Sequence, residues 1–149
     1  MPLVPDDDAS AGAAPIASHA DLTGIDVLLV EDEAATRETT RLLFESAGAT
    51  VRAVDSAHAA HAALLQRQPH VIVSDIGLPD EDGYALLQEI RLASRAAHSA
   101  DVPALALTAF ARPADRRRAL DAGFNEHLTK PVDPEQLLAI IVQLSQRKS

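Results

Sequence analysis

The sequence contains no cysteine and no tryptophan, and it has only one tyrosine and three phenylalanines. The lack of cysteine excludes a disulfide scaffold, thiolate-bound zinc or iron–sulfur clusters, and cysteine nucleophiles. The scarcity of aromatic side chains argues against a surface that stacks nucleic-acid bases or sugar rings. Any chemistry of this protein must therefore come from carboxylates, hydroxyls, amines and imidazoles.

Long hydrophobic runs and an excess of basic residues are also missing. No apolar run approaches the roughly 20 residues that span a bilayer, and the N-terminus lacks the basic and apolar regions of a secretory signal. Residues 1–33 contain eight acidic side chains and no lysine or arginine, while the rest of the chain is nearly neutral. We therefore expect a cytoplasmic protein that neither inserts into membranes nor binds nucleic acid directly.

The 149 residues divide into two parts of different composition. Residues 1–24 hold three prolines, three consecutive aspartates and many alanines and serines, with no helical or strand period. This composition is typical of a disordered tail or linker. A regular pattern begins at residue 25, and the remaining length predicts one domain over residues 25–149.

From residue 25 onward, short apolar segments alternate with amphipathic ones, which predicts alternating strands and helices. The predicted strands are Asp26–Val30, Thr50–Val54, Val71–Ser74, Ala104–Leu107 and Glu126–Thr129. The predicted helices cover about residues 34–47, 57–68, 84–94, 113–123 and 134 onward. Five such units predict an α/β fold in which helices cover both faces of one doubly wound parallel sheet.

Polar residues follow four of the five predicted strands. These residues are Glu31 and Asp32 after the first strand, Asp75 after the third, Thr108 after the fourth and Lys130 after the fifth. Each alone could be a turn, cap or surface residue, but ligands of such sheets bind at the carboxyl ends of the strands. Clustered carboxylates favour Mg²⁺, Ca²⁺ or Mn²⁺. An aspartate beside a lysine and a threonine also has the groups that an aspartyl-phosphate site needs.

Around these residues the sequence resembles the receiver domain of two-component response regulators, the CheY-like family. The matching segments are VLLVEDE at 27–33, VIVSDIGLPDEDG at 71–83, ALTA at 106–109 and LTKPV at 128–132. In style they are most similar to the C-terminal receiver of hybrid histidine kinases. The resemblance covers about residues 25–147 and implies a five-stranded, flavodoxin-like (βα)5 fold with strand order 2-1-3-4-5.

The resemblance also implies a role for each polar residue. Asp75 corresponds to the phosphoacceptor, and Thr108 and Lys130 complete the catalytic set. The ligands implied for a Mg²⁺ ion are the side chains of Glu31, Asp32 and Asp75 and the backbone carbonyl of Gly77. The acidic pair is Glu-Asp rather than Asp-Asp, a variant that should still bind Mg²⁺.

The switch residues that the resemblance implies are Thr108 and His127. The family usually has tyrosine or phenylalanine at the second of these positions, so His127 departs from the pattern. Two interpretations stay open: a histidine without a special role, or one that packs inward on phosphorylation with a protonation-dependent bias. The family also has a cis bond at the position of Lys130–Pro131, which the residues themselves do not indicate.

As a receiver, the chain would take a phosphoryl group from a phosphohistidine of a histidine kinase or a histidine phosphotransfer domain. Its only chemistry would be self-catalysed phosphotransfer and autodephosphorylation. We therefore expect that the chain is not an enzyme that acts on a separate substrate. Its output would be a changed affinity for a downstream protein at the face of the predicted fourth helix, fifth strand and fifth helix. We expect a monomer or weak dimer, acting as a single-domain regulator or as a detached hybrid-kinase receiver.

Three alternatives bear on this interpretation. A pseudo-receiver would bind partners without ever being phosphorylated. A haloacid-dehalogenase-like phosphatase also uses an aspartate after a strand, but it needs a second aspartate two residues later, where this chain has Gly77. Finally, His58 and His61 are spaced to share a helix face and could bind a metal ion, although the sequence offers no third ligand nearby.

Overall fold

The structure is a computed structural model that describes residues 21–99, 101–109 and 112–146. The strands are β1 (Asp26–Val30), β2 (Thr50–Val54), β3 (Val71–Asp75), β4 (Ala104–Thr108) and β5 (Glu126–Thr129). The helices are α1 (Ala34–Ser46), α2 (Ala57–Gln66), α3 (Gly83–Ala96), α4 (Pro113–Ala122) and α5 (Pro134–Ser145). All five predicted strands and helices are present. Asp75 and Thr108 prove to be the last residues of their strands rather than the residues that follow them.

Short polar residues, proline and glycine mark several of the helix ends, although α2 ends at Gln66 rather than directly before Pro69. At the start of α2, the side chain of Ser56 accepts a hydrogen bond from the backbone N–H of Ala59 at 3.1 Å. Helix α4 begins at Pro113 and is capped by Gly123, whose φ of 113° is left-handed. Glycine adopts this conformation without the steric cost of a Cβ atom. Local sequence therefore sets the lengths of these helices.

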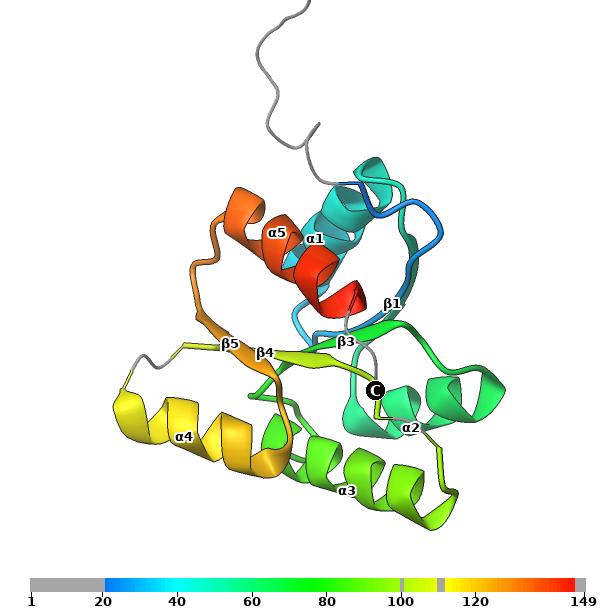
Figure 1. The fold of residues 1–149 in the computed structure, drawn as a ribbon. Helices are drawn as coiled ribbons and strands as arrows, with labels where there is room; N and C mark the ends of the chain where they lie inside the picture. The colour runs from blue at the N-terminus through cyan, green and yellow to red at the C-terminus, as the bar shows by residue number, and fades with distance from the viewer. Residues whose placement is uncertain (1–20, 100, 110–111, 147–149) are drawn as a thin grey trace, which may run out of the picture.

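The five strands form one parallel sheet in the order β2-β1-β3-β4-β5, as the resemblance implies. Helices α1 and α5 cover one face of the sheet, and α2, α3 and α4 cover the other (Figure 1). Alternate residues of β1 enter different cores, since Leu28 and Val30 pack with α2 to α4 while Val27 and Leu29 pack with α1 and α5. Burial on both faces explains why the central strands are mainly apolar between their ends.

The N-terminal boundary of the domain lies earlier than the sequence predicts. Residues 1–20 of the expected tail lie outside the described residues, but Asp21–Gly24 are described. Leu22 is fully buried in the core beneath α1. Its N–H donates to the carbonyl of Ala47 at 2.8 Å. The expected boundary at residue 24 is therefore wrong, because Leu22 already belongs to the folded domain. The sequence did not reveal this, since one apolar residue in a polar stretch forms no periodic pattern.

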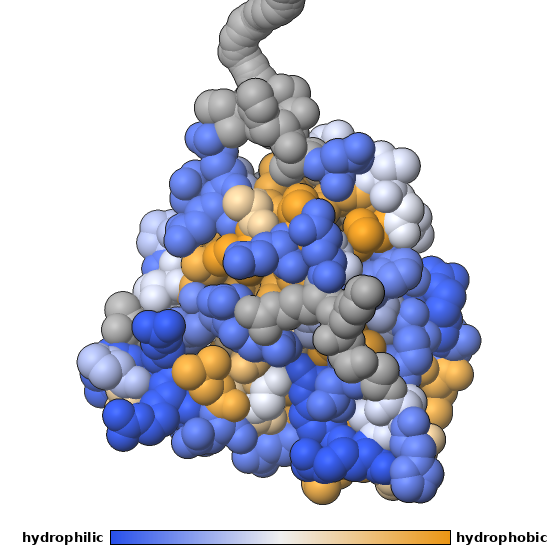
Figure 2. Space-filling model, in the orientation of Figure 1, coloured by the Kyte–Doolittle hydropathy of each residue, from blue (hydrophilic) through white to orange (hydrophobic). Residues whose placement is uncertain are grey.

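The surface is largely hydrophilic, with apolar side chains gathered beside α1 and α5 in the upper part of Figure 2. A groove of about 300 Å³ opens there, lined by α1 residues, by Lys130 and by the start of α5. Within the described ranges, no helix is both long enough and apolar enough to cross a membrane.

Candidate functional site

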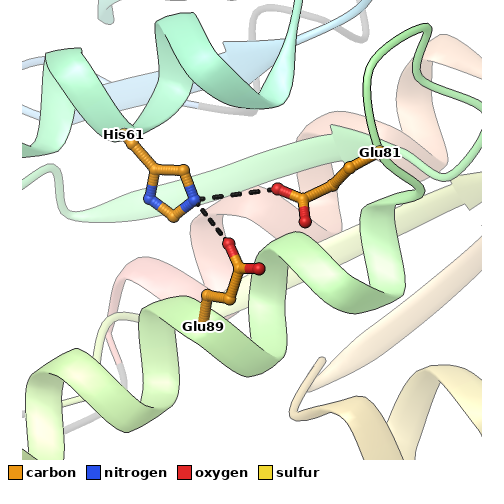
Figure 3. Close-up of side chains that lie close together, drawn as sticks. All are labelled: His61, Glu81 and Glu89. Carbon is orange, nitrogen blue, oxygen red and sulfur yellow. Dashed lines mark hydrogen bonds and ion pairs between the residues drawn. The ribbon is translucent and has the colours of Figure 1, made fainter.

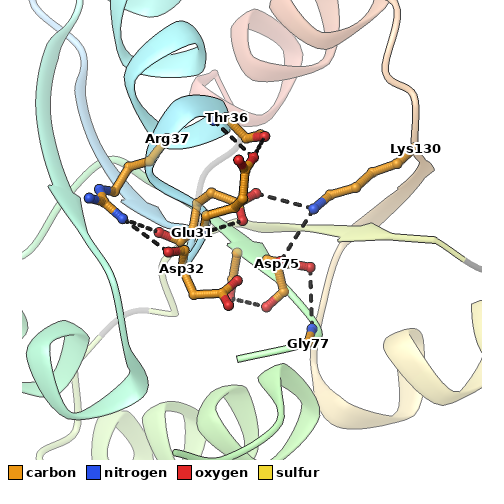
Figure 4. Close-up of polar contacts among 9 residues, drawn as sticks. Glu31, Asp32, Thr36, Arg37, Asp75, Gly77 and Lys130 are labelled. Atoms are coloured by element: carbon orange, nitrogen blue, oxygen red, sulfur yellow. Dashed lines mark hydrogen bonds and ion pairs between the residues drawn. The ribbon is translucent and has the colours of Figure 1, made fainter. Parts of the chain in front are cut away.

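Most of the predicted site residues lie together at the carboxyl edge of the sheet (Figure 4), namely Glu31, Asp32, Asp75, Gly77 and Lys130. Glu31 follows β1, Asp75 ends β3 and Lys130 follows β5. The Nζ atom of Lys130 lies 3.2 Å from Oε1 of Glu31 and 3.3 Å from Oδ2 of Asp75. The strand order explains this meeting, because β1, β3, β4 and β5 are consecutive neighbours and all run in the same direction. Residues 99 positions apart are thereby brought into contact.

Asp75 is buried, with 8% of its surface exposed, and its carboxylate is held from two sides. The backbone N–H of Gly77 donates to Oδ1 at 3.2 Å, and Lys130 contacts Oδ2. The peptide after Asp75 is fixed as well, because the N–H of Gly83 donates to the carbonyl of Ile76 at 2.8 Å. The structure therefore presents the Asp75 carboxylate in a defined orientation.

Gly83, the first residue of α3, allows this close approach of backbone segments. A Cβ atom at position 83 would lie 2.6 Å from the carbonyl oxygen of Asp75 and 2.9 Å from Cα of Ile76. Real Cβ atoms do not approach backbone atoms so closely, so only glycine fits here without displacing the end of β3. The sequence contains this glycine after three acidic residues, but its packing role could not be seen there.

Three carboxylates form a group that can hold a divalent cation. Ligand oxygens of Glu31, Asp32 and Asp75 all lie within 4.8 Å of one another. Glu31 is almost fully buried and Asp32 is exposed, so the group opens to solvent on one side. An all-oxygen set with an exposed edge suits Mg²⁺, which keeps several water ligands. For Gly77, the fourth predicted ligand, the described contact is made by its N–H rather than by its carbonyl.

The electrostatics of the site favour a bound cation. Burial raises the pKa of Glu31, and the nearby Asp75 carboxylate raises it further, against hydrogen bonds from the Glu33 N–H and from Lys130. Burial alone would lower the pKa of Lys130, but Asp75 and Glu31 raise it. Lys130 is thus held as an ammonium, yet a single ammonium does not balance three carboxylates. A dication would relieve their remaining repulsion.

Arg37 supports the first turn of the site, and sequence reasoning missed it. Its Nη1 donates to the backbone carbonyl of Glu31 at 2.9 Å and to that of Asp32 at 3.4 Å. The side chain of Glu33 caps α1 by accepting from the N–H of Thr36 at 3.1 Å. The only feature of the sequence that could have indicated this role is the position of Arg37 in the first turn of a helix, where the helix dipole disfavours a cation.

Thr108 and His127, the two predicted switch residues, occupy different places. Thr108 is buried at the end of β4, and its carbonyl accepts a hydrogen bond from the N–H of Lys130 at 2.7 Å. His127 lies on β5, paired in register with Ala106, and lines a groove with Arg116 and Arg117. Among the described residues, its buried Nε2 atom has no hydrogen-bond partner. The Lys130–Pro131 bond is cis, as the resemblance implies.

Comparison with known proteins agrees with this geometry. The family model of the response regulator receiver domain matches residues 27–142. An uncharacterized 14.6 kDa protein of Leptolyngbya boryana is 39% identical over 122 residues, which cover 82% of this chain and 91% of the relative.

Two further matches are a longer protein and a solved structure. The DNA-binding dual master transcriptional regulator RpaA of Synechocystis is 33% identical over 81% of this chain, and the chain spans only 49% of RpaA. Among solved structures, the Saccharomyces cerevisiae Ssk1 receiver domain, crystallised with the histidine phosphotransfer protein Ypd1, has a TM-score of 0.78 and 26% identity. That match covers 81% of this chain and 88% of the solved one.

Proposed function

This chain belongs to the response regulator receiver domain family of two-component phosphorelays, and from that premise we propose that it accepts a phosphoryl group on Asp75 with Mg²⁺ bound. The observation that carries the proposal is the placement of Asp75. Its buried carboxylate lies 3.3 Å from the Lys130 ammonium and forms one acidic group with Glu31 and Asp32. That arrangement combines a fixed nucleophile with one ammonium and with carboxylates that would hold a second cation, and both positive charges would act on the incoming phosphoryl oxygens.

The proposed step transfers a phosphoryl group from the phosphohistidine of a partner protein. A carboxylate oxygen of Asp75 forms the new P–O bond while the P–N bond of the donor breaks. The leaving imidazole keeps the electron pair of that bond and is neutral when its other ring nitrogen carries a proton. Lys130 places its ammonium beside the phosphoryl oxygens, where a compact charge stabilises the transition state.

Glu31, Asp32 and Asp75 would hold the Mg²⁺ ion, with the Gly77 carbonyl as a further proposed ligand. When bound, Mg²⁺ would supply positive charge to the phosphoryl oxygens in addition to that of Lys130. Glu31 is positioned by the N–H of Glu33, which donates to its Oε2 at 3.2 Å. The proposed chemistry is limited to phosphotransfer and autodephosphorylation, because no carboxylate stands two residues after Asp75 to act as a phosphatase's general acid.

The proposed donor is a histidine kinase or a histidine phosphotransfer domain. The groove between α1 and α5 reaches Lys130 at one end, so a partner seated there would lie next to Asp75. Its lining is mainly apolar and includes Leu43, Val132 and Leu137. The Ssk1 receiver, a structural neighbour of this chain, was crystallised with a partner of this class.

The proposed output is a change at the face of α4, β5 and α5. New phosphoryl oxygens would attract the Thr108 hydroxyl and the Lys130 ammonium. The hydrogen bond between the Lys130 N–H and the Thr108 carbonyl links β4 to the segment after β5. His127, on β5, would then change its packing in the groove beside α4, and a downstream protein would read that difference. We propose that the domain acts in this way as a monomer or weak dimer. The proposal is the same for a single-domain regulator and for a receiver detached from a hybrid kinase.

Intact-protein mass spectrometry after incubation with acetyl phosphate and Mg²⁺ tests the proposal. The wild type should gain one phosphoryl group, and Asp75→Asn and an EDTA-treated sample should gain none. Asp121→Asn, which alters an exposed aspartate of α4, is the matched control and should behave as the wild type. Failure with acetyl phosphate, with a phosphorylated histidine phosphotransfer protein and with beryllofluoride would instead identify a pseudo-receiver that binds partners without phosphorylation.

A further inference from the structure

A second group of metal-binding side chains lies away from Asp75, on the helices below the sheet. His61 projects from α2 toward Glu81, in the loop after β3, and Glu89, on α3 (Figure 3). The Nε2 atom of His61 lies 2.9 Å from Oε1 of Glu89 and 3.8 Å from Oε1 of Glu81. One ligand atom of each residue lies within 4.8 Å of the others. Three separate segments therefore bring one imidazole and two carboxylates to a point.

We propose that His61, Glu81 and Glu89 bind a divalent transition-metal ion, with Zn²⁺ as the representative. Imidazole nitrogen favours Zn²⁺, Cu²⁺ or Ni²⁺ over Mg²⁺, which is bound mainly by oxygen ligands. The presence of one nitrogen ligand thus distinguishes this site from the all-oxygen group at Asp75. The two sites should select different metal ions.

The separations of the three ligand atoms suit such an ion. Zn²⁺ binds nitrogen and oxygen at about 2.0–2.2 Å, so tetrahedral ligand atoms lie about 3.3–3.5 Å apart. The separations of 2.9 and 3.8 Å from His61 lie on either side of that range. Small rotations of the partly exposed glutamate side chains would make the two separations equal. Three protein ligands leave one position for water, which the exposure of all three side chains allows.

The charges around the cluster also favour a cation. Burial raises the pKa of Glu81, and the adjacent Glu89 raises it further, while His61 partly opposes this. The carboxylate of Asp80 adds to the negative charge nearby. A dication that both glutamates share would remove their mutual repulsion.

The loop that carries Glu81 is fixed to α2 beside the proposed site. The two carboxylate oxygens of Asp80 accept hydrogen bonds from the N–H groups of Ala57 at 3.0 Å and His58 at 2.9 Å. Glu81 therefore remains close to His61 whether or not an ion is bound. A bound ion would join α2, the loop and α3 by coordinate bonds.

Zinc binding should be measured with the full chain in excess Mg²⁺, by competition with a chromophoric chelator. All proteins should carry Asp32→Asn and Asp75→Asn, which remove the other group of carboxylates. We expect one Zn²⁺ per chain, with affinity at least about tenfold weaker after His61→Ala or Glu89→Gln, since loss of a ligand should cost no less than loss of a supporting residue. His58→Ala, which removes an exposed imidazole of the same helix, is the matched control and should leave the affinity unchanged.

A second measurement separates loss of the site from loss of the fold. The Tm of the protein that carries Asp32→Asn and Asp75→Asn should rise with Zn²⁺, because a ligand of the folded state stabilises it, and the Tm after the further change His61→Ala should not. Circular dichroism without metal should show that each variant is folded. Equal Zn²⁺ affinity in His61→Ala and His58→Ala, or no binding once Asp32 and Asp75 are replaced, would overturn the proposal.

Discussion

The ammonium nitrogen of Lys130 lies 3.3 Å from Oδ2 of Asp75, although β4 separates the strands that carry the two residues. Lys130 therefore reaches across the end of β4 to the centre of the site. The same ammonium contacts Glu31, which follows β1. One side chain thus connects the ends of three strands and supplies the cation in direct contact with the buried carboxylates.

Replacing Lys130 by glutamine should slow phosphorylation of Asp75 without preventing Mg²⁺ binding. The rate with acetyl phosphate should fall by about 10²–10³-fold, the usual cost of removing one group that stabilises transition-state charge. Mg²⁺ affinity should not fall, because removal of a nearby ammonium leaves the three carboxylates more negative. Mass spectrometry over time gives the rate, and Arg95→Gln, on the exposed surface of α3, is the control. An unchanged rate would show that Lys130 has only a structural role.

Glu31→Gln should alter the pH dependence of stability in the absence of Mg²⁺. Because burial raises the pKa of Glu31 in the folded state, the folded protein binds more protons than the unfolded chain at pH values between the two pKa values. Stability contributed by the neutral carboxyl is therefore present at low pH and lost as the pH rises through the raised pKa. Urea unfolding at pH 4.5 and 7 should show the variant gaining stability relative to the wild type at pH 7.

Addition of Mg²⁺ at pH 7 provides the control for this prediction. The ion should stabilise the wild type more than Glu31→Gln, because it neutralises a carboxylate that the variant lacks. A stability difference between the two proteins that is the same at both pH values would contradict an electrostatic cost at Glu31.

The sequence predicted the fold and the site at the sheet edge because both depend on local patterns. Apolar runs mark the strands, and the residues at their ends, Asp75 and Lys130 among them, must share an edge once the sheet is parallel. Cap residues such as Ser56 and Gly123 act within one turn of a helix, so their effect could also be predicted.

The residues that were missed depend on how helices and loops pack. Glu81 and Glu89 lie 20 and 28 residues after His61, and no spacing rule connects them. The metal hypothesis for His58 and His61 considered only their common helix, whereas the partners of His61 lie on α3 and the loop before it. Arg37 likewise contacts backbone carbonyls, which no side-chain pattern reveals.

Arg91 is a buried cation whose loss should strongly destabilise the protein. Its guanidinium donates to the carbonyl of Val102 at 2.6 Å and to that of Gly123 at 2.8 Å, and burial lowers its pKa. Arg91→Ala would leave both carbonyls without these donors and should lower the free energy of unfolding by about 3 kcal/mol. Arg95→Ala, one turn further along α3 and exposed, should cost no more than about 0.5 kcal/mol. Similar urea midpoints for the two variants would contradict this role.

Gly83 and Gly77 form a matched pair, because both lie near Asp75 but only one is packed against it. A Cβ atom at position 83 would lie 2.6 Å from the Asp75 carbonyl, whereas nothing lies within 4 Å of one at position 77. Gly83→Ala should therefore displace the end of β3, destabilise the protein by about 1–3 kcal/mol, as overpacking does, and slow phosphorylation. Gly77→Ala should keep wild-type stability and its backbone N–H contact with Asp75. Urea unfolding measures the change in stability, and the acetyl phosphate reaction measures the change in phosphorylation rate. A Gly83→Ala variant as stable and as reactive as Gly77→Ala would show that the close packing of Gly83 against the Asp75 backbone does not position Asp75.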